Sequence, residues 1–108
     1  MERKSLYEMH ADVCKALAHA IRIEIIDILK GKELSFGEIV DKTGVLKSNL
    51  SQHISVMVQK GILDQRKEGL HVYYKLSTPK VYEAFYMMRE VLKERILKQE
   101  KVLKKIKY

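Results

Sequence analysis

A run of hydrogen-bonding side chains opens one helix-length segment of the sequence, at residues 47–53. These groups stand in place of the Glu and Lys mixture of an ordinary solvated helix face. Asn and Gln can bond adenine with two hydrogen bonds, Lys can bond guanine, and Ser or His can bond a phosphate or another acceptor. Solvation of an exposed helix is the alternative explanation. The candidate contacts to nucleic acid are Lys47, Ser48, Asn49, Ser51, Gln52 and His53.

Basic side chains also gather in a predicted β-hairpin. The runs 62–66 and 71–76 have the length of strands, and the second run alternates as a half-buried strand does. The four residues between them, 67–70, include a glycine and form the turn. The hairpin therefore carries Arg66, Lys67 and His71 close to its tip.

The polar run begins a helix over 47–60 that is one half of a helix-turn-helix. Ser35 and Glu38 have the spacing of a capping box, in which each side chain satisfies a free backbone N–H at a helix start. This predicts a short helix over 36–42, closed by a Thr-Gly pair. Two helices joined by a tight glycine-containing turn form a helix-turn-helix. The inward residues of the second helix are Leu50, Ile54, Met57 and Val58, and Gly61 ends it.

Three further helices flank this unit. Apolar residues recur at steps of three and four over about 6–18, over 20–29 and along the segment that follows Pro79. The stripe on the last helix requires a partner, and we expect its second half to form a coiled-coil-like pair. Its basic end could instead attract DNA, lie on a membrane surface or be solvated. The stripe consists of Val81, Phe85, Met88, Leu92, Ile96, Leu103 and Ile106.

Length and composition limit the classes of protein. The 108 residues, 46% of them apolar, have the size of one domain with a modest core. One cysteine cannot form an internal disulfide, so we expect a reducing, cytoplasmic compartment, and no segment has the apolar length of a membrane span. The net charge of +7 divides into −1 over residues 1–46, +3 over 47–76 and +5 over 77–108, which favours a polyanionic partner. No catalytic motif occurs, so we expect neither an enzyme nor a cofactor.

Two segments resemble a known family. The segment KALAHAIRIEIIDIL is similar to the pattern ALxxPxRxxIL, and TGVLKSNLSQHISVMVQKGIL is similar to TGLSQxxVSxHLxxLxxAGLV. A hairpin that ends in VYYKL follows. Over roughly residues 10–80 the sequence therefore resembles the ArsR/SmtB transcriptional repressors, which are winged helix-turn-helix proteins.

The resemblance implies a mainly α fold with a small β-hairpin and a long C-terminal dimerisation helix. It implies one domain over 1–108, with N-terminal helices in 1–30, a helix-turn-helix in 35–61, a wing in 62–77 and the last helix in 79–107. It further implies a homodimeric transcriptional repressor that binds double-stranded DNA. The two recognition helices of the dimer would enter successive major grooves. The polar run would then face DNA, with Arg66, Lys67, Glu68 and Gly69 in the wing.

Three positions depart from the family pattern. Leu46 replaces a capping serine, which weakens the expected cap of the recognition helix. Ala20 replaces a proline, so a softer break is expected between the first two helices. Leu70 follows the wing glycine where an arginine is common, which removes one expected DNA contact.

The usual metal sites of the family are not matched. Ser35 and Gly37 occupy the thiolate positions, and the segment after Val81 has no histidine, so we expect no metal. The four histidines have no close ligand spacing and are expected to be exposed and unliganded. Cys14 is interpreted as a small core residue, and the sharper hypothesis makes it a redox switch between subunits. A small-molecule effector is a further alternative.

Two other interpretations remain open. The aromatic and methionine cluster at the start of the last helix could line a small-molecule pocket, although such a composition is more often core. A winged helix could also serve only as a protein–protein interaction module, without specific DNA binding. Alignment of groove-compatible donors with a basic hairpin favours DNA. The cluster consists of Tyr82, Phe85, Tyr86, Met87 and Met88.

Overall fold

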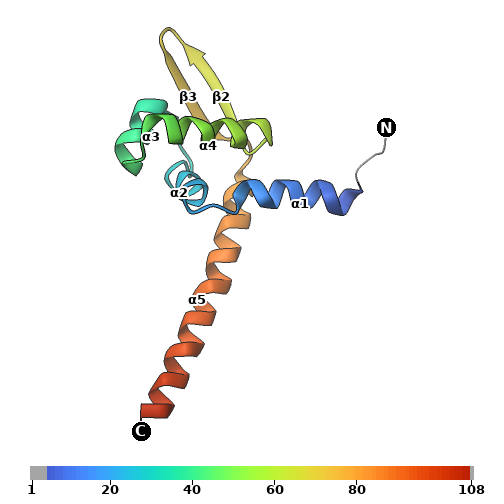
Figure 1. Ribbon diagram of the computed structural model, residues 1–108, viewed down its shortest axis with the longest axis vertical. Coiled ribbons are helices and arrows are strands. Elements are labelled where there is room, and N and C mark those ends of the chain that lie inside the picture. Colours follow the sequence, from blue (N-terminus) through green and yellow to red (C-terminus); the bar gives the residue numbers. More distant parts are fainter. Residues whose placement is uncertain (1–4, 108) are drawn as a thin grey trace.

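The computed structural model describes residues 5–107 and arranges them as five helices and three strands. The fold is therefore mainly α with a small sheet, as expected. Residues 1–4 and 108 of the predicted domain lie outside the described residues. Figure 1 shows α4 and a projecting hairpin at one end of the molecule, while α5 extends toward the other. The elements are α1 (Leu6–Leu17), α2 (Ala20–Ile28), β1 (Leu34–Ser35), α3 (Phe36–Thr43), α4 (Lys47–Gln59), β2 (Leu63–Glu68), β3 (His71–Leu76) and α5 (Pro79–Lys107).

Local capping sets the boundaries of α3. The Ser35 hydroxyl accepts a hydrogen bond from the Glu38 N–H at 3.1 Å, and the Ser35 N–H donates to the Glu38 carboxylate at 3.0 Å. These bonds form the predicted capping box, and the bond from the Ser35 N–H to the carboxylate lowers the pKa of Glu38. At the other end Gly44 has φ 68°, a left-handed conformation that glycine adopts without steric cost. The chain can therefore turn sharply from α3 into α4.

The break between α1 and α2 persists without a proline. His19 has an extended backbone, and its Nδ1 accepts a hydrogen bond from the Ile21 N–H at 3.2 Å. This side chain satisfies one of the free donors at the start of α2. A histidine cap thus replaces the proline of the family pattern, so the expected soft break is a capped helix start.

The sheet has three strands in the order β1-β3-β2, one more than the predicted hairpin. Leu34 and Ser35 of β1 pair antiparallel with Tyr74 and Tyr73 of β3. The predicted turn over 67–70 was too long, because residues 67 and 68 belong to β2 and only Gly69 and Leu70 connect the strands. Gly69 has φ 60°, which suits the first position of a tight hairpin turn.

One buried cluster joins the helices to the sheet. Ile25 of α2, Ile39 of α3, and Leu50 and Met57 of α4 are all fully buried. Leu34 of β1 is also buried, so this short strand closes one side of the core. Of the inward residues predicted for α4, Leu50, Ile54 and Met57 are buried, and Val58 is half-buried. This packing holds α4 by one face and leaves its opposite face at the surface.

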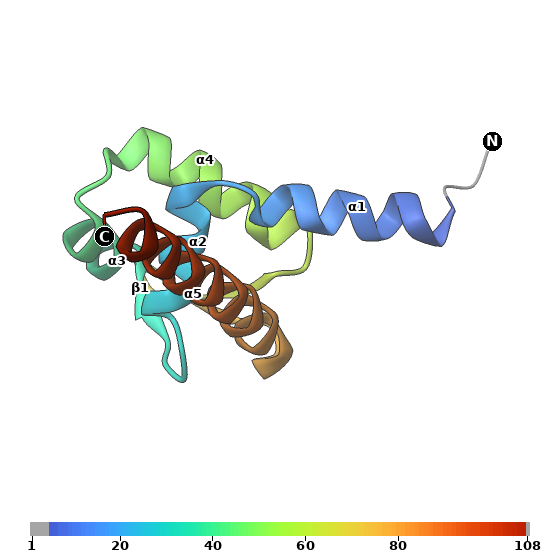
Figure 2. The ribbon, with the colours of Figure 1, turned by 90° about the horizontal axis from the view of Figure 1, so that it is seen from below.

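A large apolar surface remains uncovered on α1 and α5, and we call it the α1–α5 apolar surface. Figures 1 and 2 show α1 extending away from the other helices, and Figure 1 shows the distal part of α5 projecting beyond the core. The residues of this surface are between 41% and 86% exposed, so the core role expected for part of the aromatic and methionine cluster is wrong. They are Leu6, Tyr7, Met9, Val13, Tyr86, Met87, Met88, Val91, Leu92, Ile96, Leu97, Val102, Leu103 and Ile106.

The structure also bears on Cys14 of α1 and on the expected absence of a membrane span. Cys14 is a free, exposed thiol, so its interpretation as a core residue is wrong for the isolated chain. It lies on the same helix as the exposed Val13. Within the described residues, no helix is both long and apolar enough to cross a bilayer.

Candidate nucleic-acid interface

Exposed polar side chains cover one face of α4. The buried residues of this helix lie on the side that packs on the core, and short polar groups lie on the other. The structure therefore brings five of the six residues predicted from the polar run to a common exposed surface. Lys47 is one of these five. Ser55 and Gln59 extend the same face by two turns, and only helical spacing from Ser48 and Gln52 could have identified them. The outer face of α4 consists of Lys47, Ser48, Asn49, Ser51, Gln52, Ser55 and Gln59.

His53 does not belong to this face, and its prediction as a DNA contact is wrong. The residue is only 8% exposed, and its Nδ1 accepts a hydrogen bond from Nε of Arg22 at 3.1 Å. Its ring lies 4.2 Å from the ring of His19, centroid to centroid. Arg22 also donates to the Ala16 carbonyl oxygen at 3.3 Å. These contacts tie α4 to α2 and to the end of α1.

The electrostatic setting of His53 follows from these neighbours. Burial disfavours the charged imidazolium, and His19 and Arg22 add positive charge beside it, so the pKa of His53 lies below its ordinary value. A neutral ring can accept the bond from Arg22, whereas a doubly protonated ring cannot. The expectation that all four histidines are exposed therefore fails at this position.

The start of α4 has no side-chain cap. Leu46 occupies the N-cap position and is 77% exposed, and it makes no capping hydrogen bond. This confirms the weak cap expected from the sequence. The free N–H groups of the first turn thus remain available at the end of α4 where Lys47 and Ser48 lie, and such a helix start favours an anion.

The tip of the wing is exposed, and only some of its charge is unpaired. Lys67 and His71 are exposed on β2 and β3, and Leu70 between them is 99% exposed. Within residues 5–107 no ion pair engages Lys47 or Lys67. A hollow of about 340 Å³ is lined by Ser51 of α4, by the start of α3, and by Leu70 and His71 of the hairpin. The outer face of α4 and the tip therefore border one recess.

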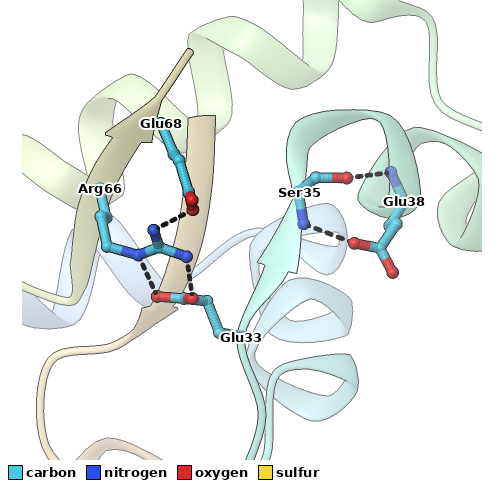
Figure 3. Close-up of polar contacts among 5 residues, drawn as sticks. All are labelled: Glu33, Ser35, Glu38, Arg66 and Glu68. Atoms are coloured by element: carbon cyan, nitrogen blue, oxygen red, sulfur yellow. Dashed lines mark hydrogen bonds and ion pairs between the residues drawn. The ribbon is translucent and has the colours of Figure 1, made fainter. Parts of the chain in front are cut away.

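Arg66 differs from the other predicted wing residues because two carboxylates hold its guanidinium. Its Nη2 lies 2.7 Å from Glu33 Oε1, and its Nη1 lies 2.5 Å from Glu68 Oε2 (Figure 3). The guanidinium also lies 4.6 Å from the centroid of the Tyr73 ring. The hydrogen bonds from Arg66 lower the pKa of Glu33. The carboxylates of Glu33 and Glu68 in turn raise the pKa of Arg66. Arg66 thus connects β2 to the segment before β1, and its charge is already compensated.

Metal ligands do not cluster in the described part of the chain. Among residues 5–107, no group of three or more His, Cys, Asp or Glu side chains could hold a metal ion. His19 and His53 are close together, but His19 Nδ1 caps α2 and His53 Nδ1 accepts from Arg22. The outer face of α4 carries hydroxyl, amide and ammonium groups.

Comparisons with known proteins agree with this geometry. The family model described as bacterial regulatory protein, arsR family, matches residues 19–65. Rv0081, an HTH-type transcriptional regulator of Mycobacterium tuberculosis, is 34% identical over 93 residues, which are 85% of this chain and 82% of Rv0081. The repressor SdpR of Bacillus subtilis is 27% identical over 71% of this chain and 86% of its own. The activator HlyU of Vibrio cholerae is 37% identical over 62% of each chain.

Solved structures show the same architecture. The crystal structure of Rv0081 has a TM-score of 0.78 to this chain, with 32% identity over 91% of this chain and 98% of that one. The solution structure of a homodimeric winged helix-turn-helix DNA-binding domain from Mycobacterium bovis has a TM-score of 0.75, with 28% identity over 87% and 92% of the two chains. The arrangement of α3, α4 and the hairpin is thus the one found in these domains.

Proposed function

Because the chain belongs to the arsR family of bacterial regulatory proteins, we propose that it binds duplex DNA as a homodimer and represses transcription. The observation that carries the proposal is the outer face of α4, where seven exposed polar residues lie together and no large apolar residue interrupts them. A helix of this kind fits a major groove, and the residues nearest its N-terminus reach the bases. Regulation of bacterial promoters also places the protein in the cytoplasm.

Each exposed residue takes a role according to its chemistry. Asn49 and Gln52 are the candidates for contacts to base edges, because an amide can bond adenine through two hydrogen bonds. Lys47 and Lys67 are the candidates for phosphate contacts, and they hold no ion pair in residues 5–107. The hydroxyls of α4 and the ring of His71 add hydrogen bonds along the backbone. Arg66 holds the hairpin in place and does not meet the DNA.

A second copy of the chain covers the α1–α5 apolar surface. So many exposed large apolar residues on two helices are rare on a monomer and mark an interface. The 29 residues of α5 span about 44 Å, so two copies can pair over a long contact. A twofold axis through this contact relates two α4 helices, and a dimer of this class reads half-sites about one turn of DNA apart.

Repression is the direction we propose. SdpR is named a repressor, and a dimer that covers a promoter excludes other proteins from it. HlyU, which is 37% identical over a shorter segment, is named an activator, so the sign of regulation requires its own measurement. A reporter gene placed behind the selected operator, with and without expression of the chain, measures it. Repression predicts lower reporter output with the chain present, and higher output would identify an activator.

DNA binding is tested by selection of a site from a random pool of duplexes. We expect a pseudo-palindromic sequence, and binding to it that weakens steeply with salt. Gln52→Ala should lower the affinity for the selected site far more than for unrelated DNA, because a lost base contact costs discrimination of about 1–3 kcal/mol. Glu94→Ala on α5 is the control, since Glu94 is exposed on the distal helix and lies outside the apolar stripe. Failure to enrich any sequence would favour a protein–protein interaction module.

A further inference from the structure

A pocket of about 560 Å³ lies away from the DNA-binding face, where the end of α2, the end of β3 and the first turn of α5 meet. Leu29, Leu76 and Tyr82 give it apolar walls. Leu29 is fully buried, so the floor of the pocket is part of the core. Figure 2 shows the connection from α2 to β1 and the start of α5 on the side away from α1. The volume falls within the range of about 300–1,000 Å³ that small-molecule sites occupy.

Three lysines border this apolar floor. Lys30, Lys32 and Lys75 all line the pocket, whereas Glu83 is the only acidic residue among the described residues that does. The Lys30 ammonium lies 4.5 Å from the centroid of the Tyr82 ring, which brings its charge over an apolar wall. Lys32 and Lys75 are exposed and form no ion pair with a described residue. Glu33 lies close to Lys75, but Arg66 binds its oxygens.

We propose that this pocket binds a small organic carboxylate with an apolar body, and that this ligand is the effector of the regulator. The apolar walls accept a ring or an alkyl chain, and the lysines bind the carboxylate at the rim. An inorganic anion would leave the walls unused, and a neutral ligand would leave the lysine charges unpaired. The charge pattern and the shape of the pocket thus select the same class of molecule.

The position of the pocket gives the ligand a means to change DNA binding. Its walls belong to β3, which forms half of the hairpin, and to α5, which carries the dimer contact. A ligand that bridges both elements fixes the angle of the hairpin relative to the dimer. Its effect on DNA affinity must equal the effect of DNA on its own affinity, because the coupling free energy is reciprocal. This part of the inference rests on the proposed function.

Ligand binding is tested on the full-length chain without DNA, by titration of ¹⁵N-labelled protein followed by NMR. The probes are benzoate, indole-3-acetate and octanoate, with benzamide as the neutral analogue of benzoate. We expect at least one acid to shift the amide signals of residues 29–32, 75–76 and 79–83, and benzamide to bind more weakly than benzoate. The variant Lys32→Gln/Lys75→Gln should lose about tenfold in affinity, because it removes two ion pairs at the rim. The control Lys101→Gln/Lys104→Gln, on the distal part of α5, should bind as the wild type does.

Three results would overturn the site: no acid shifts these signals, benzamide binds as well as benzoate, or the pocket variant keeps its affinity. The effector role is tested with the selected operator duplex. It predicts that the bound acid changes duplex affinity for the wild type and not for the pocket variant. Duplex binding with the same affinity in the presence and absence of the acid would overturn the effector role. Absence of duplex binding both with and without the acids would reject the proposed function itself.

Discussion

Substitution of two adjacent wing residues distinguishes a free cation from a paired one. Arg66 and Lys67 are neighbours on β2, and both were predicted from the sequence to contact DNA. The structure separates them, because Glu33 and Glu68 bind the Arg66 guanidinium and no ion pair in residues 5–107 engages Lys67. We therefore expect Lys67→Gln to change the electrostatics of DNA binding, and Arg66→Gln to leave them unchanged.

The size of the effect follows from counterion release. Each phosphate contact contributes about 0.9 to the slope of log affinity against log salt concentration on duplex DNA. A homodimer presents Lys67 twice, so Lys67→Gln should make the slope shallower by about 1.8. Between about 50 and 200 mM salt, the affinity advantage of the wild type should then shrink by about twelvefold. Arg66→Gln can weaken binding by loosening the hairpin, but its slope should equal that of the wild type.

Fluorescence anisotropy of the labelled operator at four or more salt concentrations measures both slopes. Lys101→Gln serves as the control, because it removes the same charge from the distal part of α5. A slope for Arg66→Gln that is as shallow as that of Lys67→Gln would contradict the difference between the free and the paired cation. It would mean that Arg66 leaves its two carboxylates and pairs with a phosphate when DNA binds.

Four further predictions concern the elements that position the interface. The pKa of His53 is lowered in the fold, so its contribution to the free energy of unfolding should be constant above about pH 6.5. Below that pH the free energy of unfolding should fall by at most about 1.4 kcal/mol per pH unit. Urea unfolding of His53→Phe should lack this decline. Leu46→Ser should add a cap and stabilise the protein by about 1 kcal/mol in the same assay. Light scattering should find Leu92→Glu/Ile96→Glu monomeric and anisotropy should find it weak on the operator, whereas a stable mutant dimer would locate the contact elsewhere. If Cys14 is a redox switch, oxidant should change the operator affinity of the wild type and not of Cys14→Ser.

Local patterns in the sequence were sufficient to predict the helices and the exposed polar face of α4. Apolar spacing identified Leu50, Ile54 and Met57 as the inner face of α4, so the polar residues between them had to lie outside. Capping chemistry at Ser35 and the glycine after α3 placed the turn of the helix-turn-helix. These features depend on residues within a few positions of one another.

Long-range packing accounts for what could not be predicted. His53 flanks the apolar stripe of α4, and its burial depends on Arg22 and His19, which belong to another part of the chain. Arg66 is paired through Glu33, a residue 33 positions earlier. Strand β1 has two residues, too few to produce an alternating pattern. Each of these features arises only when α2, α4 and the hairpin pack together.

Directed DNA cleavage from the outer face of α4 tests whether this helix enters the major groove. The chain has one cysteine, so Cys14→Ser provides a background in which Ser48→Cys can carry a tethered iron chelate that cuts DNA nearby. We expect cleavage at two positions in the selected operator, separated by about one helical turn of 10 base pairs. The same chelate attached through Lys101→Cys should cut neither position. Operator binding without cleavage from residue 48, or with cleavage from residue 101 alone, would contradict the insertion of α4 into the major groove.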